Sequence, residues 1–349
     1  MLETTSPPAA RIGSVVGDQG WSTRLALGYL MVWLALGLWT WLTDAEPMAI
    51  NRACIGGCAP GTAGHWLGTD GLGRDVWLQL SGGALPALGG GMLAATGALV
   101  IGYVLGAGAA VAGRGGRVVP WWWWVLFVMA STLGGFWWRY RDIGVSTWVP
   151  ATAVAILLAS AFVLWREPAF VRKSRWLRGG LRPDRMLLAV TEVVSSVPAL
   201  LLLLALAAIS LRPSLLQLVA IFIAVRWTGF AVQALQEVRG VLGAPYVEAA
   251  RGGGVGTFRL LTHHVLPNAA PPLLVKAVLS VGAFIVVEGS FAFLGLGLPP
   301  DQASWGRVLA QATSVRGGWW LWLLPGIPLV GCVLALQILA RRWLGEMRK

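Results

Sequence analysis

The feature of this sequence that most limits its fold is a series of long apolar segments. About 20 apolar residues span the hydrocarbon core of a bilayer. Only 12% of the 349 residues are charged, whereas about a quarter are charged in a typical soluble domain. The sequence therefore predicts an all-α polytopic membrane protein with about eight transmembrane helices. The candidate spans are roughly residues 25–42, 84–112, 118–138, 143–165, 186–209, 215–236, 270–298 and 319–340.

The positive charges are unevenly distributed between these spans. If the N-terminus is inside, eighteen Lys and Arg residues fall in inner segments and seven in outer segments. Cytoplasmic loops of membrane proteins carry such an excess, so we expect both termini to be cytoplasmic. The formal net charge of +12 is also typical of nucleic-acid binding. Here the cations lie in short clusters between apolar segments, and we expect no nucleic-acid partner.

One predicted cytoplasmic loop, residues 237–268, has an unusual pattern. Pro245 suits the first turn of a helix, where its missing N–H is not needed. The three glycines at 252–254 then end that helix, because each costs about 1 kcal/mol relative to Ala. Thr257 can cap a second short helix, and Pro267 is expected to stop it. Helical spacing puts small residues on one face of the first helix, with Glu248 beside it. This face contains Tyr246, Ala249, Ala250 and Gly253.

Four motifs in this order resemble those of a known family. Glu248-Ala249-Ala250, then Gly254 and Val265-Leu266-Pro267, resemble the EAA loop of bacterial ABC importer permeases. Residues 65–76 (HWLGTDGLGRDV) resemble the outer-loop signature of the second, C-type permease of the peptide and nickel importers. Residues 291–297 (FAFLGLG) and 304–306 (SWG) resemble the segment after its fifth core helix.

This resemblance implies a type I ABC importer transmembrane domain in the bacterial inner membrane, with a six-helix core. It implies four kinds of partner or cargo: a paralogous permease, two ATP-binding subunits, an extracytoplasmic substrate-binding protein, and a peptide or related small solute, nickel chelates included. In this family the EAA loop contacts an ATP-binding subunit. The matching positions here are Tyr246, Glu248, Ala249, Ala250, Gly254, Leu266 and Pro267.

We expect no catalytic residue, metal or cofactor in this chain, and ATP to be used by the partner subunits. A phosphate-binding loop needs Gly-Lys-Ser/Thr, and none of Lys173, Lys276 and Lys349 has that context. His65 is predicted outside, whereas His263 and His264 are predicted inside, so the three histidines cannot share a metal.

The domain organisation follows from the spans and the motifs. We assign residues 1–22 to a cytoplasmic tail, 23–64 to the first helix and outer loop, and 65–113 to the outer signature and second helix. Residues 184–345 form the permease core. The chain departs from the family at 114–183, where two extra apolar spans replace a short connector. We expect these spans to form an inserted transmembrane hairpin, with a re-entrant or interfacial element as the alternative.

Three charged residues, Glu192, Arg226 and Glu288, fall inside predicted spans. Membrane-embedded charges are often functional, and a secondary transporter driven by an ion gradient would use them. We expect Glu192 and Arg226 instead to form an ion pair between two helices, since pairing lowers the cost of burial. Glu288 has no partner that the sequence identifies.

Two cysteines, Cys54 and Cys58, lie in a polar loop that the topology puts outside. Thiols oxidise readily there, and the intervening Ile55-Gly56-Gly57 is flexible enough for a tight bridge. The sequence leaves a disulfide and two free thiols open. A metal site is disfavoured because no His lies nearby.

Overall fold

The computed structural model describes residues 19–62, 64–114, 183–209 and 213–347, and within these ranges the chain is built of helices and loops. Five helical spans are long and apolar enough to cross a membrane, or six if one bent pair is counted as a span. The predicted hairpin of 118–138 and 143–165 lies outside the described residues. The long spans are α1 (Gln19–Leu42), α2 (Val76–Ala84) with η2 (Leu85–Gly89) and α3 (Gly90–Arg114), α9 (Leu215–Leu242), α13 (Pro271–Phe293) and α15 (Trp320–Met347).

The second span begins eight residues before the predicted start at 84. Gln79 and Ser81 lie in this added stretch, and both side chains are buried. Gln79 Nε2 donates a hydrogen bond to Asp70 Oδ2 at 3.0 Å, and Ser81 Oγ donates to the Trp77 carbonyl at 2.8 Å. The Gln79 amide nitrogen and the Ser81 hydroxyl are thus paired, whereas Gln79 Oε1 has no hydrogen-bond partner among the described residues. The helix begins at Val76 and runs on through η2.

The predicted continuous span 186–209 is wrong in one respect. The chain forms two helices there, α7 (Pro183–Ser195) and α8 (Ala199–Ile209), which meet at an angle of 72°. Pro198 lies in the break. It lacks a backbone N–H and disfavours the helical conformation in the residue before it, so the first helix ends and a second begins in a new direction.

Close helix packing depends on two glycines of α3. A Cβ atom added at Gly102 would lie 2.4 Å from Phe230 Cβ, and one added at Gly106 would lie 2.2 Å from the Ala231 carbonyl oxygen. The backbones of α3 and α9 therefore touch along this seam, as small residues allow in membrane helix pairs. Ser214 and Gln217 fix the start of α9 through a capping box.

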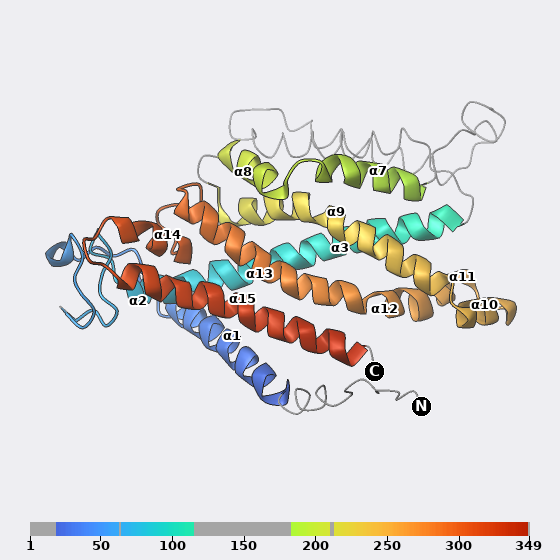
Figure 1. Ribbon diagram of the computed structural model, residues 1–349, viewed down its shortest axis with the longest axis horizontal. Coiled ribbons are helices and arrows are strands. Elements are labelled where there is room, and N and C mark those ends of the chain that lie inside the picture. The colour runs from blue at the N-terminus through green and yellow to red at the C-terminus, as the bar shows by residue number, and fades with distance from the viewer. Residues whose placement is uncertain (1–18, 63, 115–182, 210–212, 348–349) are drawn as a thin grey trace, which may run out of the picture.

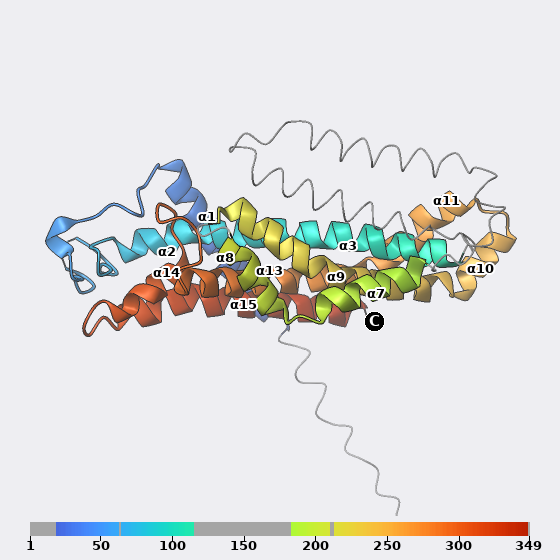
Figure 2. The ribbon, with the colours of Figure 1, turned by 90° about the horizontal axis from the view of Figure 1, so that it is seen from above.

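The helices form an elongated bundle with different structures at its two ends (Figures 1 and 2). One end carries the outer loop, residues 43–75, together with η1 (Arg52–Cys54), α14 (Trp305–Ala310) and η6 (Gln311–Thr313). Trp305, at the start of α14, is fully buried: its Nε1–H donates to the Leu80 carbonyl at 2.7 Å, and its ring packs edge-on against Trp33. The short helices of the EAA loop lie at the opposite end (Figure 1).

Candidate functional site: the EAA loop and the membrane-embedded charges

The EAA loop (residues 237–268) contains the last turns of α9 and three short helices. These are α10 (Pro245–Gly252), α11 (Thr257–Leu260) with its π-helical continuation η5 (Leu261–Val265), and α12 (Leu266–Ala269), which leads into α13. Pro245 occupies the first turn of α10, as the sequence predicts. The loop is thus a folded helical unit at the end of the bundle.

Buried apolar side chains anchor this unit to the transmembrane helices. Val247 of α10, Leu260 of α11 and Val265 of η5 are fully buried in one cluster with residues of α3, α7 and α9. Tyr103 of α3 adds a hydrogen bond from its hydroxyl to the Leu266 carbonyl. At about 1.5–3 kcal/mol for each fully buried aliphatic side chain, these contacts hold the unit firmly against the bundle. Leu187, Leu235 and Val238 are among their partners.

One of the three consecutive glycines has a specific conformational role. Gly254 has φ +81°, whereas Gly252 ends α10 and Gly253 has φ −74°. The Val255 N–H donates to the Ala250 carbonyl at 3.1 Å, and the Gly254 N–H donates to the Arg251 carbonyl at 3.1 Å. This is a Schellman motif, which uses a glycine in the left-handed conformation to end a helix. Only position 254 of the three has this requirement.

Much of α10 is exposed away from the bundle, and its exposed residues include both small and large side chains. Glu248 and Ala249 are exposed, Tyr246 is 47% exposed, and Ala250 is half-buried. Asn268 Nδ2 donates a hydrogen bond to the Tyr246 hydroxyl at 3.2 Å, which links the two ends of the unit. An exposed surface that is anchored in this way can receive another protein.

Phe258 extends this exposed surface, and the sequence reasoning missed it. Its side chain is 80% exposed on α11. Leu260, two positions later, faces the bundle instead. Aromatic side chains, Phe included, are enriched in the cores of protein–protein interfaces.

Two local predictions for this loop are wrong. Gly256, not Thr257, is the N-cap residue of α11, and no side chain caps the helix. Pro267 does not stop the helical chain but lies in the first turn of α12. The π-helical turn η5 just before it accounts for the difference, because this wider turn begins a new helical segment in which Pro267 needs no N–H partner.

The polar residues of the outer-loop signature stabilise the fold of the outer loop. Asp70 is fully buried, and its Oδ1 accepts hydrogen bonds from the backbone N–H groups of Leu72 and Arg74, both at 2.9 Å. Asp75 Oδ1 caps α2, while its Oδ2 pairs with His65 Nδ1 at 2.6 Å. These polar side chains satisfy backbone groups and each other, so their role is to fold the loop.

Cys54 and Cys58 form a disulfide in this loop, with their Cα atoms 5.2 Å apart. Cys54 is buried, and Thr69 of the signature accepts a hydrogen bond from the Cys58 N–H at 2.8 Å. The bridge therefore joins the signature to the chain that precedes it. No group of three or more potential metal ligands occurs among the described residues.

The three membrane-embedded charges do not come together. Glu192 is exposed on α7, and the predicted ion pair with Arg226 is wrong: the two side chains share no ion pair or hydrogen bond. Glu192 lies on α7, before the bend at Pro198, and its exposed side chain does not reach Arg226. Glu288 is buried in α13, and neither of its carboxylate oxygens has a hydrogen-bond partner among the described residues.

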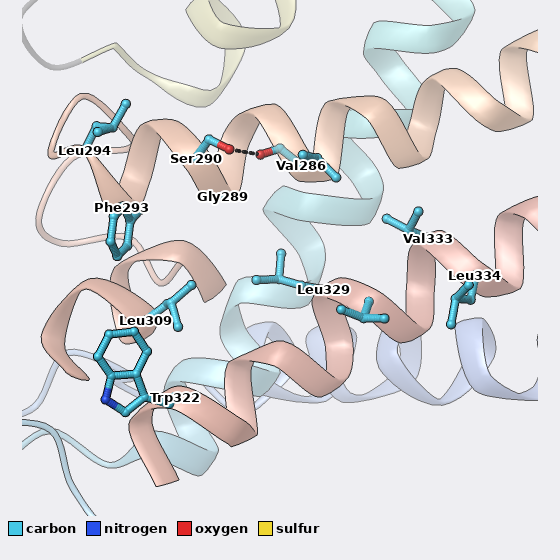
Figure 3. Close-up of a pocket in the computed structure, with 11 residues that line it drawn as sticks. Val286, Gly289, Ser290, Phe293, Leu294, Leu309, Trp322, Leu329, Val333 and Leu334 are labelled. Atoms are coloured by element: carbon cyan, nitrogen blue, oxygen red, sulfur yellow. Dashed lines mark hydrogen bonds between the residues drawn. The ribbon is translucent and has the colours of Figure 1, made fainter. Parts of the chain in front are cut away.

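An apolar cavity of about 610 Å³ lies between α13, α14 and α15 (Figure 3). Phe293, Leu309 and Trp322 are among its lining residues. Ser290 supplies the polar group in the lining, and its hydroxyl donates to the Val286 carbonyl of its own helix at 2.7 Å. This lining suits acyl chains and offers little to a polar solute.

Comparison with known proteins identifies the class. Residues 174–347 match the family model described as binding-protein-dependent transport system inner membrane component. The chain is 26% identical to a peptide transport system permease protein of Brucella suis biovar 1 over 89% of this chain and 81% of that protein. It is 31% identical to a peptide permease protein of Brucella ovis over 57% of this chain and 67% of that protein. A di/tripeptide transport system permease protein of Pseudomonas aeruginosa is 34% identical over 47% of this chain and 55% of that protein.

The chain belongs to the family of binding-protein-dependent transport system inner membrane components. It is a permease subunit of an ABC importer and a multi-pass protein of the bacterial inner membrane, in agreement with its apolar helices.

Proposed function

We propose that this chain forms the translocation pathway of an ATP-driven peptide importer together with a paralogous permease. Two ATP-binding subunits supply the hydrolysis, and an extracytoplasmic binding protein delivers the peptide. The names of three relatives, which describe peptide or di/tripeptide permeases, support this substrate class.

We further propose that the EAA loop is the contact with an ATP-binding subunit. The supporting observation is its two-sided construction. Val247, Leu260 and Val265 are buried against the bundle, while Glu248, Ala249 and Phe258 are exposed on the other side. A partner that moves the exposed side would move the transmembrane helices with it, since the buried side resists separation.

Two substitutions test this contact. Ala249→Trp puts a large ring on the exposed surface of α10, and Glu248→Arg reverses the charge beside it. Both positions are exposed, so we expect normal membrane insertion and normal pairing with the second permease. We expect each variant to lose co-purification of the ATP-binding subunit, and to lose peptide uptake in reconstituted vesicles.

Ala59→Trp is the matched control, because Ala59 is an exposed alanine of the outer loop, at the other end of the bundle. This variant should retain the ATP-binding subunit. The proposed contact is refuted if Glu248→Arg and Ala249→Trp both assemble fully and take up peptide normally.

A further inference from the structure

The break between α7 and α8 opens onto a second cavity, of about 230 Å³. Its wall combines the broken segment with the middle of α9 and an early turn of α13, and Figure 1 shows α7 and α8 lying along α9. The side chains that give it its charge are Arg226 of α9 and Lys276 of α13. The apolar cavity of Figure 3 has no charged group in its lining.

These two cations have partners that leave their charge uncompensated. Lys276 Nζ donates to the Gly229 carbonyl and lies 5.1 Å from the centroid of the Phe230 ring. The Arg226 guanidinium lies 5.9 Å from the centroid of the Phe222 ring, and its buried Nε has no hydrogen-bond partner. Within the described parts of the chain, no carboxylate lies within ion-pair distance of either residue.

An arrangement of this kind is costly inside a membrane. Cation–π contacts offset only part of the free-energy cost of placing a charged side chain at the middle of a membrane helix. Arg226 is the twelfth residue of the 28-residue α9, so it lies near the middle of that helix. The two like charges also repel each other, and the cavity is therefore strongly electropositive.

The helix break adds to this potential. Pro198 and Ala199, at the start of α8, line the same cavity. The first N–H groups of a helix lack intrahelical acceptors and carry partial positive charge. Interrupted membrane helices present such N-termini to anionic groups of transported solutes. Two side-chain cations and the first residue of a helix thus line one small cavity.

We propose that this cavity binds the carboxylate of the peptide in transit. This inference rests on the proposed function and adds the part of the peptide that the permease recognises. The volume suits a carboxylate with a few waters, since a water occupies about 30 Å³ in the liquid, and leaves the rest of the peptide outside the cavity. The carboxylate would supply the missing counter-charge and an acceptor for Arg226.

A cysteine probe tests the charge of the cavity in the complete transporter. Ser195 lines the cavity and is exposed, and Ser195→Cys is nearly isosteric. Cys332 is buried and Cys54 and Cys58 form a disulfide, so the new thiol is the reactive one. We expect sulfonatoethyl methanethiosulfonate to modify it about tenfold faster than the trimethylammonioethyl reagent, relative to their rates with a free thiol.

Charge variants then assign that preference to the two cations. Arg226→Gln and Lys276→Gln should each reduce the ratio of the two modification rates, anionic reagent over cationic, whereas Lys276→Arg should preserve this ratio. Arg24→Gln removes an exposed cation of α1, outside the cavity lining, and should change nothing. Dialanine should protect the thiol from modification, and dialanine amide, which lacks the carboxylate, should protect it less.

Three outcomes would overturn the inference. One is equal modification by both reagents in the parent Ser195→Cys protein. Another is equal protection by the acid and the amide. The third is complete protection without peptide in the assembled transporter, which would mean that the second permease supplies the counter-charge. Each is distinguishable from failure of the proposed function, which would appear as absence of ATP-dependent peptide uptake by the unmodified transporter.

Discussion

The outer loop (residues 43–75) and the EAA loop (residues 237–268) are both rich in glycine and both carry family motifs, yet they use those motifs in opposite ways. In the outer loop the polar motif side chains Asp70 and His65 turn inward and bond to the loop's own backbone and side chains, although Trp66 of the same motif is exposed. In the EAA loop the apolar residues between the motif positions hold the fold, and Glu248 and Ala249 are left exposed. A motif therefore marks a fold in one region and a candidate contact surface in the other.

The largest expected loss of stability comes from replacing one glycine of the outer loop, and a second glycine of that loop serves as its control. Gly73 and Gly61 have nearly equal φ values, +79° and +80°. A Cβ at Gly73 would lie 2.3 Å from the Asn51 carbonyl oxygen, whereas no described atom lies within 4 Å of one at Gly61. We expect Gly73→Ala to lower the free energy of unfolding in detergent by about 3 kcal/mol, the sum of backbone strain and overlap. Gly61→Ala should cost about 1 kcal/mol, and equal effects would contradict the overlap.

Asp70→Ala tests whether the buried carboxylate of the outer-loop signature stabilises the fold of that loop. It removes a buried acceptor of three hydrogen bonds, two from backbone N–H groups and one from Gln79. Hydrogen bonds to charged groups contribute about 1.5–3 kcal/mol each and are not additive. We therefore expect the substitution to lower the free energy of unfolding, measured by thermal unfolding, by about 3 kcal/mol. Asp301→Ala, at an exposed position, should change stability by less than about 0.5 kcal/mol. A stable Asp70→Ala protein would mean that the motif does not fold the loop.

Reduction of the Cys54–Cys58 disulfide should have an intermediate effect. The bridge closes a loop of only five residues, for which the chain-entropy model gives about 2 kcal/mol. We expect thermal unfolding to begin earlier in the presence of a phosphine reductant. A Cys54→Ser, Cys58→Ser protein serves as the control, since the reductant should not shift its unfolding further. The ATP-binding subunit should still co-purify with the reduced protein, because the EAA loop lies at the other end of the bundle.

The smallest expected change in stability comes from replacing glycines of the EAA loop, where two positions can be compared. Gly254→Ala forces an L-residue into φ +81° and should cost about 1 kcal/mol. Gly252→Ala, in the last turn of α10, should instead be neutral or stabilising by up to about 1 kcal/mol. Thermal unfolding of the two variants gives the difference, and destabilisation by both to the same extent would contradict the Schellman geometry.

The sequence predicted most of the long helices because a transmembrane helix leaves a simple signal, a long apolar run. It failed at the start of the second span, where the polar Gln79 is buried and bonded to Asp70 of the preceding loop. It failed again at Pro198, whose bend depends on a backbone conformation that an apolar run does not reveal. The EAA loop was located from its motif. Phe258 was missed because exposure of one ring in a short helix depends on how that helix is anchored.

The seam between α3 and α9 has a mechanical consequence. Gly102 and Gly106 bring the two backbones into direct contact, so the pair resists bending more than a single helix does. The 28 residues of α9 make a rod about 42 Å long, stiffened along part of its length and attached at one end to α10. A displacement of α10 would therefore be carried along α9 with little elastic deformation where α9 packs against α3.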